Sequence, residues 1–230
     1  MAINFLRSDI VGVGNGVKVL VYGRAGVGKT TLIATAPVPF IISAENGLMS
    51  LRHFQIVGAE VKTYDDMLEI YNWMIGSAEA RQFATICLDS VTEIAERILE
   101  NEKFANKDPR KAYGETHDKV LSLLRKFRDI SHKNIYFSAK QESIKDEVTG
   151  LSLYGPSMPG RQLGPALPYL FDEIFNLGIA KTPQGQEYRY LRTAPDNQYD
   201  AKDRSGALQP FEPADLSAIF NKIRSSGAIQ

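Results

Sequence analysis

Eight residues, Gly23-Arg-Ala-Gly-Val-Gly-Lys-Thr30, constrain this chain more than any other stretch, because they match the phosphate-binding pattern G-x-x-x-x-G-K-[ST] at every fixed position. The glycines of such a loop let backbone N–H groups turn inward towards phosphate oxygens. Lys29 would reach the outer phosphates, and Thr30 would offer its hydroxyl to Mg²⁺. A chance match in this length is on the order of one in a hundred. The predicted phosphate site consists of Gly23, Arg24, Ala25, Gly26, Val27, Gly28, Lys29, Thr30 and Thr31.

Short apolar runs alternate with helical stretches along the first 140 residues. The runs typical of buried strands are 17–22, 38–43, 83–88 and 134–138. The segments between them are long enough for crossover helices, which predicts an α/β fold with a mostly parallel central sheet flanked by helices. Helices are expected at 29–35, 65–75, 91–104, 115–130 and, with Pro213 in its first turn, at about 213–225.

The pattern changes after residue 140. Residues 150–168 hold four glycines and four prolines, which predicts an extended loop. Strand-like runs at 171–180 and 188–193 flank Thr182-Pro-Gln-Gly185 and predict a C-terminal antiparallel hairpin. The sequence shows no repeat or interdomain linker, so we expect residues 1–230 to form a single domain with its core at about 15–210.

Composition narrows the class of protein. The 27 Lys and Arg residues balance 27 Asp and Glu residues, which argues against a uniformly basic nucleic-acid binder but leaves local patches open. Cys87 is the only cysteine, so the chain has no internal disulfide and no multi-cysteine zinc site. No apolar run approaches the ~18 residues of a spanning helix, and the N-terminus lacks a secretory pattern, so we expect a cytoplasmic protein that does not enter membranes.

Polar side chains follow three of the predicted strands at the expected phosphate edge. Asp89 ends an apolar strand and is expected to hold hydrated Mg²⁺; it could also cap the next helix, although Ser90 is the better candidate for the cap. Glu45 could polarise the water that attacks the γ-phosphate, or it could be a solvated turn residue. Lys140 and Gln141 are candidate γ-phosphate sensors, with a surface loop as the alternative.

These parts, in this order, resemble the RecA/RadA ATPase core, in which the catalytic glutamate follows an early strand and does not adjoin the metal-binding aspartate. Here Glu45 is early and Asp89 is followed by Ser90. The segment Ala201-Lys-Asp-Arg-Ser-Gly206 resembles the Lys-Asn-Arg-Phe-Gly motif of bacterial RadA and the finger of hexameric replicative helicases. In those families the basic pair reaches the neighbouring subunit's nucleotide, which implies that role for Lys202 and Arg204.

Residues 15–210 resemble the small phage ATPases of the RecA/RadA superfamily that act in single-strand annealing recombination. The resemblance implies Mg²⁺-dependent hydrolysis of ATP to ADP and phosphate, stimulated by DNA, in the host cytoplasm if the gene is viral. It also implies single-stranded DNA binding by a ring or filament of identical subunits, with annealing assisted by a single-strand DNA-binding protein.

Two segments are candidates for DNA contact. Residues 103–133 carry nine Lys and Arg against four acids, and the run Lys107–Gly114 combines cations, a turn and an aromatic ring. The alternative is a solvated helix face. The long loop 149–164 matches the family's second DNA loop, with a mobile lid as the alternative. The candidate DNA-binding residues are Lys107, Arg110, Lys111, Tyr113, Tyr154 and Arg161.

Three other functions are alternatives for a chain with this phosphate loop. A regulatory GTPase needs a D-x-x-G soon after the phosphate loop, whereas the one that follows the loop here, Asp203–Gly206, lies far too late in the chain. A small-molecule kinase needs a lid of closely spaced arginines, which is not evident. A nucleotide-gated assembly module that senses ATP and acts on a protein partner with little turnover stays open.

Overall fold

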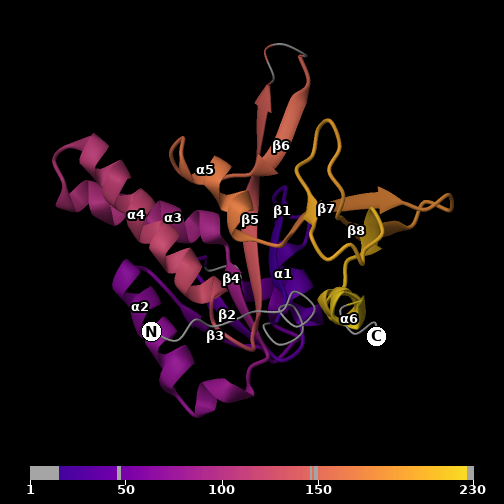
Figure 1. Cartoon of the computed structure of the whole chain (residues 1–230), viewed down its shortest axis with the longest axis horizontal. Helices are drawn as coiled ribbons and strands as arrows, with labels where there is room; N and C mark the ends of the chain where they lie inside the picture. The colour runs from indigo at the N-terminus through magenta and orange to yellow at the C-terminus, as the bar shows by residue number, and fades with distance from the viewer. Residues whose placement is uncertain (1–15, 46–47, 146, 148–149, 227–230) are drawn as a thin grey trace, which may run out of the picture.

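The computed structural model describes residues 16–45, 48–145, 147 and 150–226, and it is built around one twisted sheet (Figure 1). The parallel strands lie in the order β3-β2-β4-β5-β1-β7, and β8 and β10 extend the sheet beyond β7 by antiparallel pairing. Two further strands pair antiparallel at the margins, β6 with β5 and β9 with β7. The strands are β1 Lys18–Gly23, β2 Pro39–Ser43, β3 Val57–Glu60, β4 Thr85–Asp89, β5 Asn134–Lys145, β6 Ser152–Pro156, β7 Glu173–Lys181, β8 Glu187–Arg192, β9 Lys202–Asp203 and β10 Phe211–Pro213.

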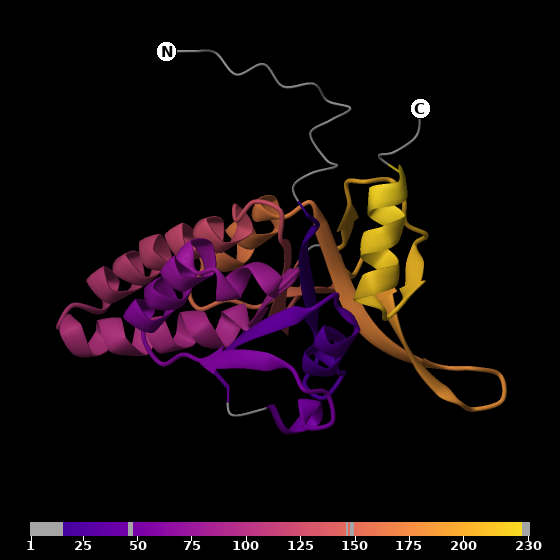
Figure 2. The same ribbon diagram turned by 90° about the horizontal axis from the view of Figure 1, so that it is seen from below.

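Helices cover both faces of the sheet, as the α/β prediction requires (Figure 2). Helices α2 Tyr64–Gly76, α3 Val91–Ala105 and α4 Pro109–Arg128 pack on one face, and α1 Lys29–Leu32 and α6 Leu216–Ser226 pack on the other. Strand β1 serves both cores, because successive side chains alternate: Leu20 and Tyr22 join the first, and Val19 and Val21 join the second. The shorter helices are α5 Leu163–Ala166 and the 3₁₀ turns Ile33–Thr35, Leu48–Leu51, Glu79–Gln82 and Leu167–Leu170. The predicted α/β fold, with a mostly parallel central sheet, flanking helices and a C-terminal antiparallel hairpin, is confirmed.

Side-chain caps fix where the long helices begin. Ser90 accepts a hydrogen bond from the backbone N–H of Glu93 and caps α3, as expected. Asp108 caps α4 in the same way, and Pro109 follows at the first helical position. Helix α4 therefore begins six residues before the predicted 115, and most of the run 107–114 is helix, not loop.

Two other predictions were wrong. Residues 150–168 form no extended loop, because β6 pairs with the part of β5 that runs past the sheet edge, and α5 with a 3₁₀ turn follows. Residue 149 lies outside the described part of the chain, as do the termini 1–15 and 227–230. Pro213 belongs to β10, where it pairs with Tyr190, so the last helix starts only at Leu216.

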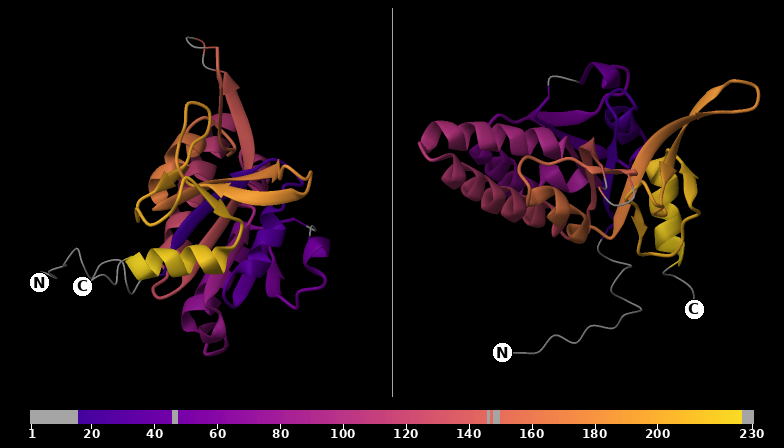
Figure 3. Two further views of the ribbon diagram at one scale, coloured as in Figure 1. Left: turned by 90° about the vertical axis from the view of Figure 1, so that its right-hand side faces the viewer. Right: turned by 90° about the horizontal axis from the view of Figure 1, so that it is seen from above.

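Two antiparallel pairs extend beyond the packed body (Figure 3). One is the β5–β6 ribbon, which extends from the edge of the sheet where the carboxyl ends of β1 and β5 and the phosphate loop lie. The other is the β7–β8 hairpin, whose turn lies at 182–186, as predicted. Within the described residues, none of the helices has the length and apolar character needed to cross a membrane.

Candidate nucleotide-binding site

The phosphate loop joins the carboxyl end of β1 to α1, so the expected strand and helix flank it. Gly26 and Gly28 have φ values of 74° and 104°, in the left-handed region that favours glycine. The Nζ of Lys29 donates to the carbonyl oxygens of Gly23 at 2.8 Å and Arg24 at 3.1 Å. Val27 contributes more than its backbone, because its side chain is buried in the core beside α1. The loop therefore has the backbone turn that phosphate binding needs.

Asp89 lies at the end of β4, within reach of the first turn of α1. Its Oδ2 accepts a hydrogen bond of 2.6 Å from Thr30 Oγ1, and its Oδ1 accepts one from Ser138 Oγ. The peptide bond between Asp89 and Ser90 is cis. Mg²⁺ prefers oxygen ligands and usually keeps several waters, so a hydroxyl beside a carboxylate is a donor set that fits it. The two residues predicted to hold the metal are thus direct neighbours.

Glu45 follows β2 at the same edge of the sheet. Its Oε1 accepts a hydrogen bond of 3.1 Å from Ser90 Oγ, which places the carboxylate next to the turn that carries Asp89. Burial lowers the pKa of Lys29, while the nearby charges of Asp89 and Glu45 act in the opposite direction. Glu45 therefore lies within electrostatic reach of the phosphate-binding lysine, on the exposed side of the site. Residues 46 and 47, which follow it, lie outside the described part.

The two candidate sensors extend from β5, the strand beside β1. Lys140 is the register partner of Gly23, and its Nζ contacts Glu93 at 2.7 Å and Glu96 at 2.6 Å on α3. Burial opposes its charge, but these two hydrogen bonds raise the pKa of Lys140 overall. Gln141 accepts a hydrogen bond of 3.0 Å from Asn176 on β7. Both residues lie at the phosphate edge, with their side chains held by neighbouring elements.

Lys202 and Arg204 lie away from this site. Strand β9 pairs with the first residues of β7, where Glu173 is opposite Asp203 on one side and Val19 of β1 on the other. Val19 precedes Gly23 by four residues, roughly 13 Å along a strand. Lys202 Nζ donates to the carbonyl of Pro168 at 3.0 Å, and Arg204 forms an ion pair of 2.7 Å with Asp172. Burial, followed by the charge of Arg204, lowers the pKa of Lys202.

Comparison with known proteins identifies this arrangement. The AAA domain family matches residues 15–205, which is most of the chain. The chain belongs to the AAA domain family. Together with the phosphate loop at the end of β1, this makes it a nucleotide-binding P-loop ATPase. Among solved structures, a KaiC-like protein from the hyperthermophilic archaeon Pyrococcus horikoshii is 14% identical, with a TM-score of 0.48 over 84% of this chain and 88% of that one. No curated protein matches the sequence.

Part of the predicted DNA surface of this AAA domain comes together in space. Lys107, Arg110 and Lys111 are exposed where α3 turns into α4. Tyr113 is 43% exposed, and Lys103 Nζ lies 5.3 Å from the centre of its ring. Gly160 lies against the same ring, since a Cβ there would be 3.3 Å from Tyr113 Cδ1. The segment that contains exposed Arg161 therefore borders the start of α4.

Tyr154 differs from these residues. Its ring stacks on Tyr199 with the ring centres 4.8 Å apart, and its carbonyl oxygen accepts a hydrogen bond from the hydroxyl of Tyr22. Tyr154 thus has packing partners within the chain. Tyr188 and Tyr190, two residues apart on β8, pack together on one face of the strand, with their ring centres 6.4 Å apart.

Two residues near these surfaces were missed from the sequence. Phe104, at the end of α3, is 87% exposed beside Lys103. Its place at the end of an expected helix, next to cations, was the available signal. Arg189 on β8 donates from Nε to the carbonyl oxygen of Val27 at 2.8 Å, so it contacts the phosphate loop directly. No local pattern signals that contact, because it depends on how β8 lies in the sheet.

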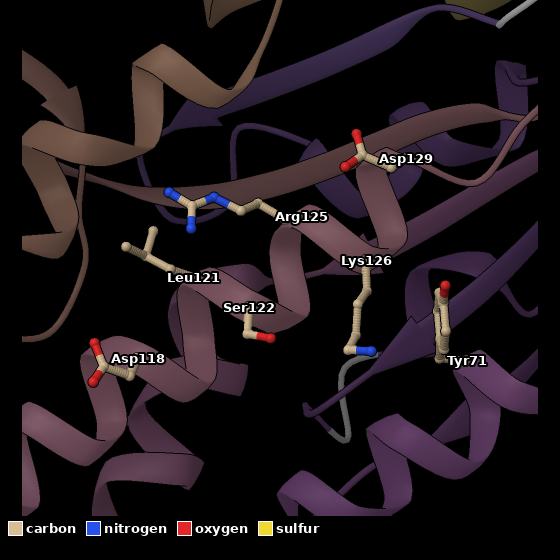
Figure 4. A pocket seen from close by; sticks show the side chains of 7 residues that line it. All are labelled: Tyr71, Asp118, Leu121, Ser122, Arg125, Lys126 and Asp129. Carbon is tan, nitrogen blue, oxygen red and sulfur yellow. The ribbon is translucent and has the colours of Figure 1, made fainter. Parts of the chain in front are cut away.

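A surface hollow lies between α2 and the second half of α4 (Figure 4). Lys126 of α4 lies over the ring of Tyr71 on α2, with Nζ 5.2 Å from the ring centre, and Asp118, Arg125 and Asp129 add both signs of charge. This end of α4 leads into the amino end of β5, so the hollow is separate from the nucleotide edge of the AAA domain.

Proposed function

We propose that this ATPase hydrolyses ATP between subunits and uses the cycle to bind and anneal single-stranded DNA as a recombination protein. The observation that carries the proposal is the separation of two sets of residues. Thr30, Asp89 and Glu45 meet at one edge of the sheet, whereas Lys202 and Arg204 lie towards the other. A basic pair that cannot serve its own phosphate loop suits a role in a neighbour's site.

The residues of the phosphate edge divide the chemistry among them. The loop amides and Lys29 would hold the phosphates, and Thr30 with Asp89 would hold Mg²⁺, which neutralises phosphate charge when bound. Glu45 would accept a proton from the attacking water. Lys140 and Gln141 would respond to the γ-phosphate from β5. Lys202 and Arg204 of the adjacent subunit would stabilise the charge that develops on the transferred phosphoryl group.

The DNA part of the proposal rests on the surface around the start of α4. Exposed Lys107, Arg110 and Lys111 supply cations for a phosphate backbone, and Tyr113 offers a ring face near Arg161. Phe104 adds an apolar ring beside them. Cations around exposed rings are the combination that binds single strands with little sequence preference.

The test is ATP turnover with and without single-stranded DNA at two salt concentrations. We expect DNA to stimulate turnover, added salt to weaken the stimulation, and Lys111→Ala to reduce it. Lys181→Ala is the matched control, because that lysine is exposed on the β7–β8 hairpin, where it forms an ion pair of 3.7 Å with Glu187. An ATP turnover rate that is the same with and without DNA at both salt concentrations would contradict the DNA role, but it would not contradict ATP hydrolysis.

The exposure of Phe104 also favours a second function, a nucleotide-gated module that docks a protein partner and turns over little ATP. Glu45→Gln distinguishes the two. In an ATPase this variant should lose most turnover while it still binds ATP. In a nucleotide-gated module it should change only the residence time of the nucleotide.

A further inference from the structure

Strand β8 presents different side chains to its two faces. One face carries Tyr188, Tyr190 and Arg192. The guanidinium of Arg192 lies 4.7 Å from the ring centre of Tyr199. Leu191 is on the other face and is buried in the core that also holds Val27 of the phosphate loop. Arg189 is two residues from Leu191 and therefore shares its face. The fold thus places one arginine of the β7–β8 hairpin beside the phosphate loop.

The contact between Arg189 and the loop is specific. Its Nε donates to the carbonyl oxygen of Val27 at 2.8 Å, across 162 residues of sequence. The next residue, Gly28, lies directly under the side chain, since a Cβ at that position would be 2.7 Å from Arg189 Nε and 3.2 Å from its Cδ. The contact therefore depends on a glycine whose φ of 104° already excludes most other residues.

The hydrogen bond fixes the direction of a phosphate-binding group. The peptide unit is planar and trans, so the carbonyl of Val27 and the N–H of Gly28 point to opposite sides of it. Because Arg189 holds the carbonyl oxygen of Val27 on one side of this peptide unit, the N–H of Gly28 stays directed to the opposite side. Backbone N–H groups are what a phosphate loop offers to its ligand. A charged donor on the carbonyl also polarises the amide and strengthens its N–H as a donor.

We propose that Arg189 is a positioning residue for nucleotide phosphates, which acts through the Val27–Gly28 peptide and from the same subunit. This role rests on nucleotide binding by the ATPase domain and is independent of DNA. It is also distinct from the role of Lys202 and Arg204, which lie away from their own phosphate loop. Strand β8 would therefore contribute to the nucleotide site through Arg189 alone.

The test is titration of the full chain with fluorescent ADP and ATP analogues in Mg²⁺ without DNA, beside steady-state ATP turnover. We expect Arg189→Ala to weaken binding about tenfold, the size of one hydrogen bond to a charged group. KM should rise by a similar factor with kcat retained, because the lost interaction is shared by ground state and transition state. Arg189→Lys should recover part of the affinity, since it keeps the charge but loses the planar donor.

Lys181→Ala on the same hairpin is the matched control and should bind nucleotide like the wild type. The melting temperature without nucleotide separates a structural effect from a positioning one. Unchanged affinity in Arg189→Ala, or a fall in kcat with KM retained, would overturn the proposal. Because the titration contains no DNA, failure here leaves the proposed recombination function untouched, and failure of DNA stimulation leaves this inference untouched.

Discussion

Gly28 combines two requirements that only glycine meets. Its φ of 104° is strained for any side chain, and Arg189 occupies the space that a Cβ would need. Gly26 has a φ of 74°, but among the described residues nothing lies within 4 Å of the position that a Cβ would take, so only the backbone conformation favours glycine there. We expect Gly28→Ala to weaken nucleotide binding by at least about tenfold, and more than Gly26→Ala. Nucleotide titration of both variants checks this, and equal losses would show that the contact with Arg189 adds nothing.

Glu173 makes stability depend on pH. Burial, and then the charge of Asp203, raises its pKa to about 8 from an ordinary value of 4.5. Its Oε2 is buried and has no hydrogen-bond partner among the described residues. The folded state therefore holds a proton that the unfolded state releases at lower pH. The stability due to this proton is fully present below pH 4.5 and is lost as the pH rises through about 8.

Glu173→Gln tests this dependence, because glutamine stays neutral at every pH. The wild type should lose up to about 1.4 kcal/mol of unfolding free energy per pH unit within that window, and the variant should lose less. Urea unfolding at pH 6 and pH 8 measures both slopes. Glu187→Gln is the control, since that side chain is exposed on β8. Identical slopes for wild type and Glu173→Gln would contradict the assignment.

At the scale of elements, α2 begins with a reciprocal cap. Thr63 Oγ1 accepts from the N–H of Asp66 at 3.1 Å, and Asp66 Oδ2 accepts from the N–H of Thr63 at 2.9 Å. Thr63→Ala should lower the unfolding free energy by about 1 kcal/mol, because it leaves an N–H without its partner. Thr63→Ser keeps the hydroxyl and should stay near the wild type. Urea unfolding measures both free energies. Equal losses of unfolding free energy in Thr63→Ala and Thr63→Ser would exclude the cap as the cause.

The elements predicted correctly are those that local pattern encodes. Buried parallel strands are continuous apolar runs, so β1, β2, β4 and the start of β5 could be recognised from composition alone. The predicted start of α4 is six residues too late, because Asp108 and Pro109 are a stronger signal for the start of a helix than Gly114 is for a turn. Strand β6 was missed because its partner is the end of β5, and pairing of this kind depends on tertiary context more than on propensity.

The candidate site divides in the same way. The phosphate loop and the acidic residues that end β2 and β4 are readable because each lies at a strand terminus of a parallel sheet, where ligands bind. The contact of Arg189 with Val27 joins two segments 162 residues apart and has no local signature. The location of Lys202 and Arg204 on a short strand beside β7 likewise follows only from the assembled sheet.

On the scale of the whole molecule, the sheet separates two halves of one proposed catalytic unit. The phosphate loop lies at the carboxyl end of β1, and the basic pair lies beside the first residues of β7. Head-to-tail contact between identical subunits brings different faces of the chain together, as a ring or filament requires. A basic finger supplied by a neighbour in this way is worth about 10³ to 10⁵ in rate in related NTPases.

Mixing two inactive variants tests whether the site is shared. Lys29→Ala removes the phosphate lysine and keeps the basic pair, whereas the double variant Lys202→Ala, Arg204→Ala does the reverse. Each alone should be nearly inactive. An equal mixture that exchanges subunits should regain about a quarter of wild-type turnover, because about one interface in four then pairs an intact loop with an intact finger. A mixture as inactive as its components, with exchange verified by labelled subunits, would place both functions within a single chain and rule out the shared site.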